Sequence, residues 1–136
     1  EADEETGKVM LQVARRERER FLGIDDIHDF PCEDLRTINQ LWLNYSNGKF
    51  GFSVQKDIYE SLGGTRKYGQ QVSEKFGDRV GWRKGGSWLY NYSDITFNLE
   101  LAPKAHLPRF RNSGDWGEVS QRSLLEAILR AKTCEL

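Results

Sequence analysis

Hydrophobic residues recur at helical spacing within the first half of the chain. Pro31 before the pattern and Asn47-Gly48 after it are typical start and stop signals for a helix. The stripe between them lies on one helical face: Leu35, Ile38, Leu41, Trp42 and Tyr45. A stripe this wide predicts a helix that packs in the core of the fold.

The same spacing predicts further helices on both sides of this one. The expected elements are a helix over 1–18, a short helical turn at 24–27, a helix capped by Ser53 and closed by Gly63-Gly64, a helix over 68–76 closed by Gly77, and a terminal helix over 118–132. Acidic residues begin the first of these helices and basic residues end it, which complements the helix dipole. The chain therefore reads as mostly helical.

The pattern changes after Asp78, where aromatic residues and glycines replace the helical stripe. The aromatic residues of this segment, 79–116, are Trp82, Trp88, Tyr90, Tyr92, Phe97, Phe110 and Trp116. The sequence around Gly85-Gly86 fits either a β-hairpin or an irregular loop that closes over a helical body. Pro103 and Pro108 keep the residues between them out of regular structure.

Charge is divided unevenly along a chain of 136 residues whose net charge is −1. Six basic and three acidic residues give the 79–116 segment a charge of +3, which leaves −4 for the rest. The whole chain therefore has no overall attraction to nucleic acid or to an anionic membrane. No apolar run is long enough to span a bilayer.

The chain ends and the cysteines add two expectations. The first residue is Glu1 rather than Met, so we expect that a leader or an upstream domain precedes it. Cys32 and Cys134 are too few for a disulfide framework and lack CxxC spacing. A reducing compartment is therefore the default expectation.

Aromatic rings beside arginines suit a flat apolar ligand with an anionic rim. A tetrapyrrole with propionates fits this description, and so does single-stranded nucleic acid stacked on the rings. The structural alternative is that these rings form core beneath a long loop. The sequence has no P-loop, no dinucleotide fingerprint and no catalytic triad, so no catalytic residues are assigned. His28 lies near three aspartates, but consecutive loop positions rarely converge on a metal ion.

Seven blocks spread over most of the chain carry a family resemblance. They are EADEET (1–6), FPCEDLRTI (30–38), LW..YSNGKFGFSVQ (41–55), SLGGT (61–65), FGDRVGWRKGGSWL (76–89), YSDITF (92–97) and AP.AHLP (102–108). In these blocks the sequence resembles the genomes-uncoupled-four family, the tetrapyrrole-binding regulators of magnesium chelatase in oxygenic phototrophs. The resemblance departs at Tyr90-Asn91, where this chain is one residue longer.

The resemblance implies one all-α domain over residues 1–136, shaped like a cupped hand and truncated inside its first conserved helix. Two long loops and their flanking helices would form an apolar palm for porphyrin, and the YSD segment would be loop or helix. The implied ligands are protoporphyrin IX and its magnesium derivative. The implied role is stimulation of magnesium chelatase through its large porphyrin-binding (H) subunit, without catalysis by this protein.

Site residues follow from the position of each block in the family pattern. The resemblance implies a porphyrin site formed by Val9, Phe21, Trp82, Arg83, Trp88, Phe97, His106, Leu107, Arg109, Phe110 and Arg111. Arg109, Arg111 and Arg83 are the candidates for pairing with propionates. His106 is expected to bind as a hydrogen-bond donor rather than to ligate the central metal.

Two other functions remain open from the sequence. One is a sensor or scaffold in which a tetrapyrrole, including a linear bilin, changes a signalling contact without chelatase activation. The other, weaker one is a nucleic-acid binder that uses the +3 segment, and the favoured interpretation has no nucleic-acid partner. The expected location is the cyanobacterial cytoplasm or the plastid stroma, in part at thylakoid or envelope membranes.

Overall fold

The computed structural model describes residues 2–20, 22–67, 69–89, 92–109 and 118–136. In chain order the elements are α1 (Ala2–Val13), α2 (Ile24–His28), α3 (Cys32–Ser46), α4 (Phe52–Ser61), α5 (Gln70–Val80), β1 (Arg83–Lys84), β2 (Ser87–Trp88), the 3₁₀ helix η1 (Tyr92–Asp94) and α6 (Glu118–Thr133). The all-α class is confirmed, with one small two-stranded hairpin added to it. The YSD segment is helical, as the resemblance implies.

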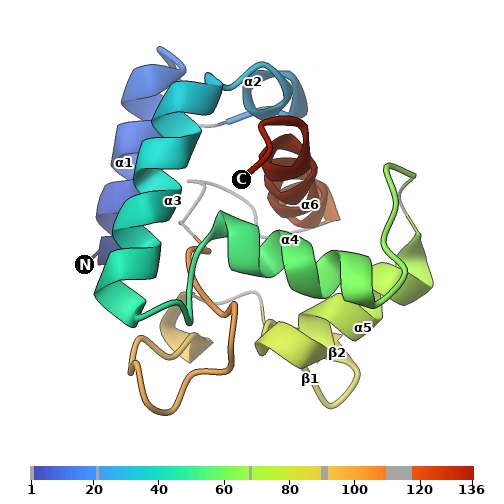
Figure 1. The fold of residues 1–136 in the computed structure, drawn as a ribbon. Helices are drawn as coiled ribbons and strands as arrows, with labels where there is room; N and C mark the ends of the chain where they lie inside the picture. Colours follow the sequence, from blue (N-terminus) through green and yellow to red (C-terminus); the bar gives the residue numbers. More distant parts are fainter. Residues whose placement is uncertain (1, 21, 68, 90–91, 110–117) are drawn as a thin grey trace.

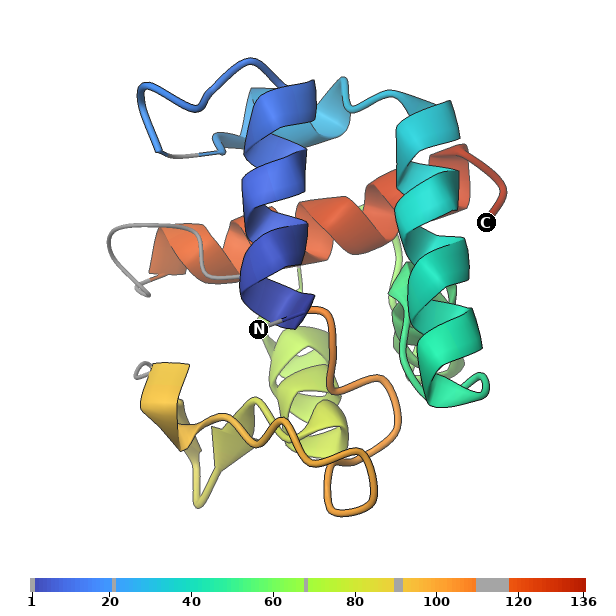
Figure 2. The same ribbon diagram turned by 90° about the vertical axis from the view of Figure 1, so that its left-hand side faces the viewer.

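The helices pack in two directions around a shared core. Figure 1 and Figure 2 show α1 and α3 running antiparallel, with α6 running across them. Helices α2, α3 and α4 all contact α6, and α5 contacts α4 and β1. Within the described ranges, none of the helices combines the length and the apolar character that crossing a bilayer needs.

Helix α3 begins after Pro31 and ends at Asn47, as its sequence signals predict. Asn47 adopts the left-handed conformation and its N–H donates to the Leu43 carbonyl oxygen. Trp42 is buried, and its Nε1 donates to Thr6 Oγ1 of α1 at 3.0 Å. The predicted apolar stripe is wrong in two places, because Leu41 and Tyr45 are each 64% exposed on the outer face of the helix.

Helix α1 ends at Val13, five residues before the predicted end at 18. Arg15 adopts a left-handed φ of 59°, and the Arg16 N–H donates to the Leu11 carbonyl oxygen at 2.8 Å. This pattern is a helix-terminating motif in which glycine is the usual residue. An arginine in that position gives no stop signal in the sequence, so the predicted helix extended past it to residue 18.

Helix α4 starts at Phe52 after Gly51, not at the predicted cap Ser53. The Ser53 N–H donates instead to Asn39 Oδ1 of α3 at 3.0 Å, so α3 caps α4. Gly51 has a φ of 139°, and a Cβ there would lie 2.8 Å from Asn39 Oδ1. Only glycine fits this junction, because the left-handed φ and the close approach both exclude a side chain.

Helix α5 continues through Gly77 to Val80 and is closed by Gly81 in the left-handed conformation, so the predicted stop is wrong. Gly77 is buried in the helix against the Trp88 ring. The hairpin alternative for the next segment is confirmed: β1 and β2 pair antiparallel around Gly85-Gly86. Both glycines have positive φ, as a type I′ turn requires.

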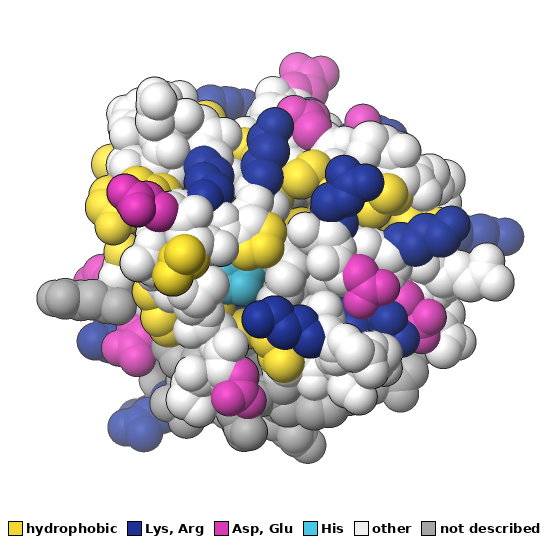
Figure 3. All heavy atoms as spheres, turned by 90° about the horizontal axis from the view of Figure 1, so that it is seen from below, with side chains coloured by type: hydrophobic (Ala, Val, Ile, Leu, Met, Phe, Trp, Pro, Cys, Tyr) yellow, Lys and Arg dark blue, Asp and Glu magenta, His cyan; other side chains and the backbone are white. Residues whose placement is uncertain are grey.

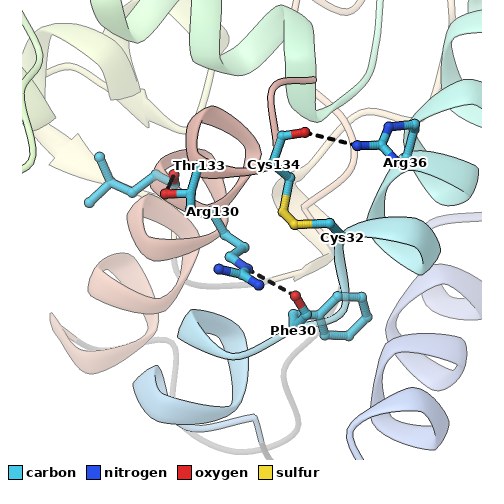
Figure 4. The surroundings of a disulfide bond; sticks show 7 residues. Phe30, Cys32, Arg36, Arg130, Thr133 and Cys134 are labelled. Carbon is cyan, nitrogen blue, oxygen red and sulfur yellow. Dashed lines mark hydrogen bonds between the residues drawn. A yellow bond between two sulfur atoms is a disulfide. The ribbon is translucent and has the colours of Figure 1, made fainter.

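A disulfide joins Cys32 to Cys134, although the sequence suggested free cysteines in a reducing compartment. Their Cα atoms lie 5.3 Å apart across a sequence separation of 102. Figure 4 shows the bond between the start of α3 and the end of α6. Nothing in the spacing of two cysteines this far apart predicts their contact, because it depends on the packing of α6.

Candidate functional site

A pocket of about 450 Å³ lies along one face of α1. The residues that line it among those described are Glu4, Gly7, Lys8, Leu11, Gln12, Glu17 and Arg20. The first five share a helical face, and the last two belong to the 14–20 loop that follows the helix. Its volume falls within the range of about 300–1,000 Å³ that is common for small-molecule sites.

The 14–20 loop is held in place by Asp26 of α2. Its Oδ1 accepts a hydrogen bond from Arg16 Nε at 2.9 Å, and its Oδ2 accepts one from the Gly23 N–H at 2.8 Å. The hydrogen bond from the Arg16 guanidinium to Asp26 raises the pKa of Arg16 above its ordinary value. One carboxylate therefore fixes both the start of α2 and the loop that closes the pocket.

The pocket has an apolar floor and a charged rim. Leu11 packs against the core, whereas Lys8 is exposed and reaches Glu5 only at 3.9 Å. The Arg20 backbone N–H donates to the Arg16 carbonyl oxygen at 2.9 Å, whereas its guanidinium has no hydrogen-bond or ion-pair partner among the residues that the structure describes. The rim therefore offers two cations to an anionic group, although Glu4 and Glu17 lie on the same lining.

Four residues assigned to the porphyrin site from the sequence are buried in the core. Trp82, His106, Leu107 and Arg109 are each at most 3% exposed. Trp82 Nε1 donates to the His106 carbonyl oxygen at 2.7 Å, and the Arg109 guanidinium lies 5.5 Å from the Trp82 ring centre. Trp82 contacts both His106 and Arg109 in the core, and Leu107 is buried in the same hydrophobic cluster as Trp82.

This cluster connects the 105–109 segment to α1. The Arg109 N–H donates to Asp3 Oδ1 at 2.6 Å, and the Arg109 guanidinium donates to the Leu89 carbonyl oxygen at 2.6 Å. Gln55 Nε2 of α4 donates to the Pro108 carbonyl oxygen at 2.8 Å. Asp3 therefore joins the helix that lines the pocket to the chain that leads into residue 110.

The environment of His106 favours the neutral form of its imidazole. Burial lowers its pKa below the ordinary value of 6.5, and the neighbouring Arg109 charge acts in the same direction. Backbone contacts with Val80 and Thr96 raise the pKa by a smaller amount. The Val80 carbonyl oxygen, 2.7 Å from Nδ1, can only accept, so Nδ1 carries the proton.

The other sequence-assigned residues lie in different surroundings. Val9 and Trp88 are half-buried, and Trp88 packs on Gly77. Arg83 pairs with Asp78 at 3.1 Å, which leaves its charge already compensated. Phe97 is 41% exposed. The remaining three assignments, Phe21, Phe110 and Arg111, lie outside the described residues.

The basic segment forms part of another face, shown in Figure 3. Lys and Arg side chains are spread across this face, with Asp and Glu side chains among them and hydrophobic side chains between. Within the 95–109 segment, Phe97 and Leu101 are the exposed large hydrophobic residues. The mixed charge differs from the continuous basic groove that tracks a nucleic-acid backbone.

Metal ligands do not gather among the described residues, where no group of three or more His, Cys, Asp or Glu could hold an ion. His28 instead lies 3.1 Å from Glu126 of α6. Both residues line a second, smaller pocket of about 160 Å³ between α2 and α6. The aspartates next to His28 in the sequence therefore do not assemble a site with it.

The resemblance placed Val9 and Phe21, from the first helix and the following turn, in the porphyrin site, but it named none of the described residues that line the α1 pocket. Glu4, Lys8 and Leu11 follow helical spacing, but the stripe is mostly polar and resembles an ordinary solvated helix face. The available signal was Gly7 within that face, since a glycine inside a helix costs stability and often marks a close approach. The loop reversal at Arg15, which closes the pocket, had no such signal.

Comparisons with known proteins agree on one family. The GUN4-like family model matches residues 1–124. A Ycf53-like protein from Synechocystis sp. is 34% identical over 109 residues, covering 79% of this chain and 43% of the relative. The chloroplastic tetrapyrrole-binding protein of Arabidopsis thaliana is 33% identical over 118 residues, covering 79% of this chain and 42% of the relative.

The ligand-free structure of Arabidopsis thaliana GUN4 superposes with a TM-score of 0.70 at 23% identity, covering 93% of this chain and 82% of that chain. This likeness shows a shared fold. The chain spans less than half the length of the curated relatives that it matches. The family model, the relatives and the fold agree, and the chain belongs to the GUN4-like family.

Proposed function

We propose that this protein binds a tetrapyrrole in the α1 pocket. The observation that carries the proposal is the pocket of about 450 Å³ with Leu11 in its floor and Lys8 and Arg20 at its rim. An apolar floor can bury a flat macrocycle while cations at the rim pair with carboxylates. A relative from Arabidopsis named as a tetrapyrrole-binding protein supports the same ligand class.

We further propose protoporphyrin IX and Mg-protoporphyrin IX as the ligands, and stimulation of magnesium chelatase in chlorophyll biosynthesis as the outcome. The protein would act without catalysis of its own, through the large H subunit of the chelatase. Stimulation requires that the porphyrin-loaded protein bind one state of the chelatase more tightly than another. The proposed location is the cyanobacterial cytoplasm or the plastid stroma, in part at membranes. In a plastid, we propose a further role in plastid signalling.

In this proposal some residues contact the porphyrin and others hold the contacting residues in place. Leu11 and Val9 of α1, with Phe21 and Phe110, supply apolar contact. Lys8, Arg20 and Arg111 pair with the propionates. Trp82, His106, Leu107 and Arg109 support the site from the core through the Asp3 hydrogen bond. Arg83, Trp88 and Phe97 belong to a neighbouring wall.

A tryptophan-fluorescence titration tests the proposal. We expect saturable quenching by protoporphyrin IX and by Mg-protoporphyrin IX, because the buried tryptophans lie in the same small domain as the pocket. A single-stranded RNA is the negative control, and biliverdin tests the linear-bilin alternative. Absence of quenching by either porphyrin would contradict the proposal, and quenching by biliverdin alone would favour the sensor function.

Charge-removing variants locate the site within the protein. Lys8→Gln, Arg20→Gln and Arg111→Gln should each weaken porphyrin binding about 5-fold, on the order of 1 kcal/mol for a partly exposed charge-assisted contact. Lys75→Gln on α5 is the matched control, because Lys75 is exposed and lies outside the pocket lining. Equal dissociation constants for all four variants and the parent would show that the rim is assigned incorrectly.

A further inference from the structure

The disulfide links two parts of the fold that are distant in the sequence. Cys32 is the first residue of α3, and Cys134 follows directly after the last residue of α6. The bond closes a covalent loop that contains α3, α4, α5, the hairpin and α6. It is the only disulfide that can form within this chain, since the chain has two cysteines.

The two cysteine residues differ in their exposure to solvent. Cys134 is 4% exposed, whereas Cys32 is only partly buried. A reductant therefore reaches Cys32 first. A thiolate at Cys32 lies at the start of α3, where the helix dipole stabilises negative charge. Glu33 and Asp34 in the same turn are exposed to solvent and offset part of this effect.

Hydrogen bonds around the disulfide hold both ends in place without it. Figure 4 shows Arg36 donating to the Cys134 carbonyl oxygen at 3.0 Å and Arg130 donating to the Phe30 carbonyl oxygen at 2.9 Å. Lys56 of α4 also donates to the Leu136 carbonyl oxygen at 2.7 Å. These contacts keep the cysteines close after reduction, so the bond can form again in the folded protein.

The compartments of the relatives suggest that this disulfide differs in function from the stable disulfides of secreted proteins. The matched proteins come from a cyanobacterium and from a chloroplast. In reducing intracellular compartments of mesophiles, a disulfide is usually transient and serves catalysis or redox sensing. We propose that Cys32 and Cys134 form a reversible thiol–disulfide site whose reaction partner is a dithiol, either a small molecule or a thioredoxin-type protein.

The exchange proceeds in two balanced steps. A thiolate of the dithiol attacks Cys32 Sγ, the bond to Cys134 Sγ breaks, and Cys134 leaves as a thiolate that takes up a proton. The second thiolate of the dithiol then attacks the mixed disulfide and releases Cys32. The protein disulfide is reduced by two electrons, and the dithiol is oxidised to its own disulfide.

The first test counts thiols on the folded chain. The oxidised protein is incubated without denaturant with dithiothreitol or with reduced thioredoxin, quenched with a maleimide, and analysed by intact mass. We expect both cysteines to become labelled together and to return to the disulfide form on oxidation with diamide. Reduction by thioredoxin at low concentration identifies a protein partner, and reduction by dithiothreitol alone identifies a small dithiol.

Matched single variants test the order of attack. Cys134→Ser leaves the thiol of Cys32, and Cys32→Ser leaves that of Cys134. We expect the maleimide to label Cys32 at least about 10-fold faster than Cys134, because exposure controls access to the thiolate. Equal rates, or faster labelling of Cys134, would overturn this order.

Thermal unfolding measures what the bond contributes. Closing a loop of about 100 residues constrains the unfolded chain, so reduction should lower Tm by about 10–15 °C while the helical CD spectrum remains. The double variant Cys32→Ser/Cys134→Ser should have the Tm of the reduced parent, and dithiothreitol should not change it. A disulfide that stays closed in excess dithiol until denaturant is added, or that never forms, overturns the proposal. None of these measurements requires porphyrin, so they are independent of the proposed function.

Discussion

His106 donates from Nδ1 to the Val80 carbonyl oxygen inside the core, and its pKa is lowered mainly by burial. The unfolded chain therefore takes up a proton near the ordinary pKa of 6.5 that the folded chain resists. Its contribution to stability is complete above pH 6.5. That contribution is lost progressively as the pH falls from 6.5 toward the lower pKa of the folded state.

We expect the free energy of unfolding to fall by up to about 1.4 kcal/mol per pH unit below pH 6.5 because of this residue. His106→Asn should reduce that slope, since an amide keeps a donor for the Val80 carbonyl oxygen and does not titrate. Urea denaturation of both proteins between pH 7.5 and pH 5 measures the difference. Identical slopes would show that His106 is not the group responsible.

Arg109 has a role that its sequence context did not reveal. A basic residue next to a family block suggested a propionate partner, but the side chain is 2% exposed and contacts Leu89 and Trp82. Its backbone N–H donates to Asp3 Oδ1, which lies 106 residues earlier. A contact over that distance leaves no periodicity in the sequence, whereas a basic residue beside aromatics is easy to see.

Arg109→Ala should lower the free energy of unfolding by about 2–5 kcal/mol, because it removes a large buried side chain and leaves the Leu89 carbonyl oxygen without its donor. Arg83→Ala is the comparison and should cost no more than about 1 kcal/mol, because its ion pair with Asp78 is partly exposed to solvent. Chemical denaturation gives both values. Parent-like stability of Arg109→Ala together with weaker porphyrin binding would instead support the predicted role of Arg109 in ligand binding.

Helix boundaries followed the sequence where their signals are local. Pro31 and Asn47 mark α3 correctly because both act on their own backbone. The start of α4 was misplaced because Asn39, 14 residues earlier than Ser53, supplies its cap. The end of α5 was misplaced because Gly77 serves packing rather than termination. Elements whose ends depend on another element cannot be bounded from one stretch of sequence.

Gly77→Ala should separate these two uses of glycine. Alanine favours a helix interior by about 1 kcal/mol, but its Cβ would lie 2.6 Å from the Trp88 ring. We expect a net loss of about 1–3 kcal/mol from overpacking and a changed near-UV CD signal of tryptophan. Gly69→Ala is the control, since nothing lies within 4 Å of a Cβ there, and should change stability by less than about 1 kcal/mol. A more stable Gly77→Ala variant would contradict the packing of the hairpin on α5.

At the scale of the whole molecule, ligand binding and folding are linked. A ligand that binds only the folded state at 100 times its Kd stabilises a protein by about 2.7 kcal/mol. Protoporphyrin IX at that excess should therefore raise Tm by about 10 °C. Differential scanning fluorimetry with a dye that does not overlap porphyrin absorbance measures the shift. An unchanged Tm at saturating porphyrin would show that the porphyrin binds the unfolded chain equally well or that it binds no defined site.

The whole-molecule features were predicted unevenly from the sequence. The fold class followed from helical spacing and the family blocks, which are distributed through the chain. The resemblance placed Val9 and Phe21 in the site, but the residues that line the pocket were not predicted because two separate segments supply them, α1 and the 14–20 loop, and the loop turns back at an arginine. The disulfide was also missed because it joins two distant segments, and its formation depends on how α6 packs against α3.

The disulfide also divides the molecule into two parts that differ in how readily they open. Helix α1 and the 14–20 loop precede Cys32, so they lie outside the covalent loop and are joined to it by contacts such as Asp3–Arg109 and Thr6–Trp42. Segments held this way open more readily than the unit to which they attach. Amide hydrogens of α1 should therefore exchange faster than those of α4. The wall of the pocket can then adapt to a guest while the remainder stays folded.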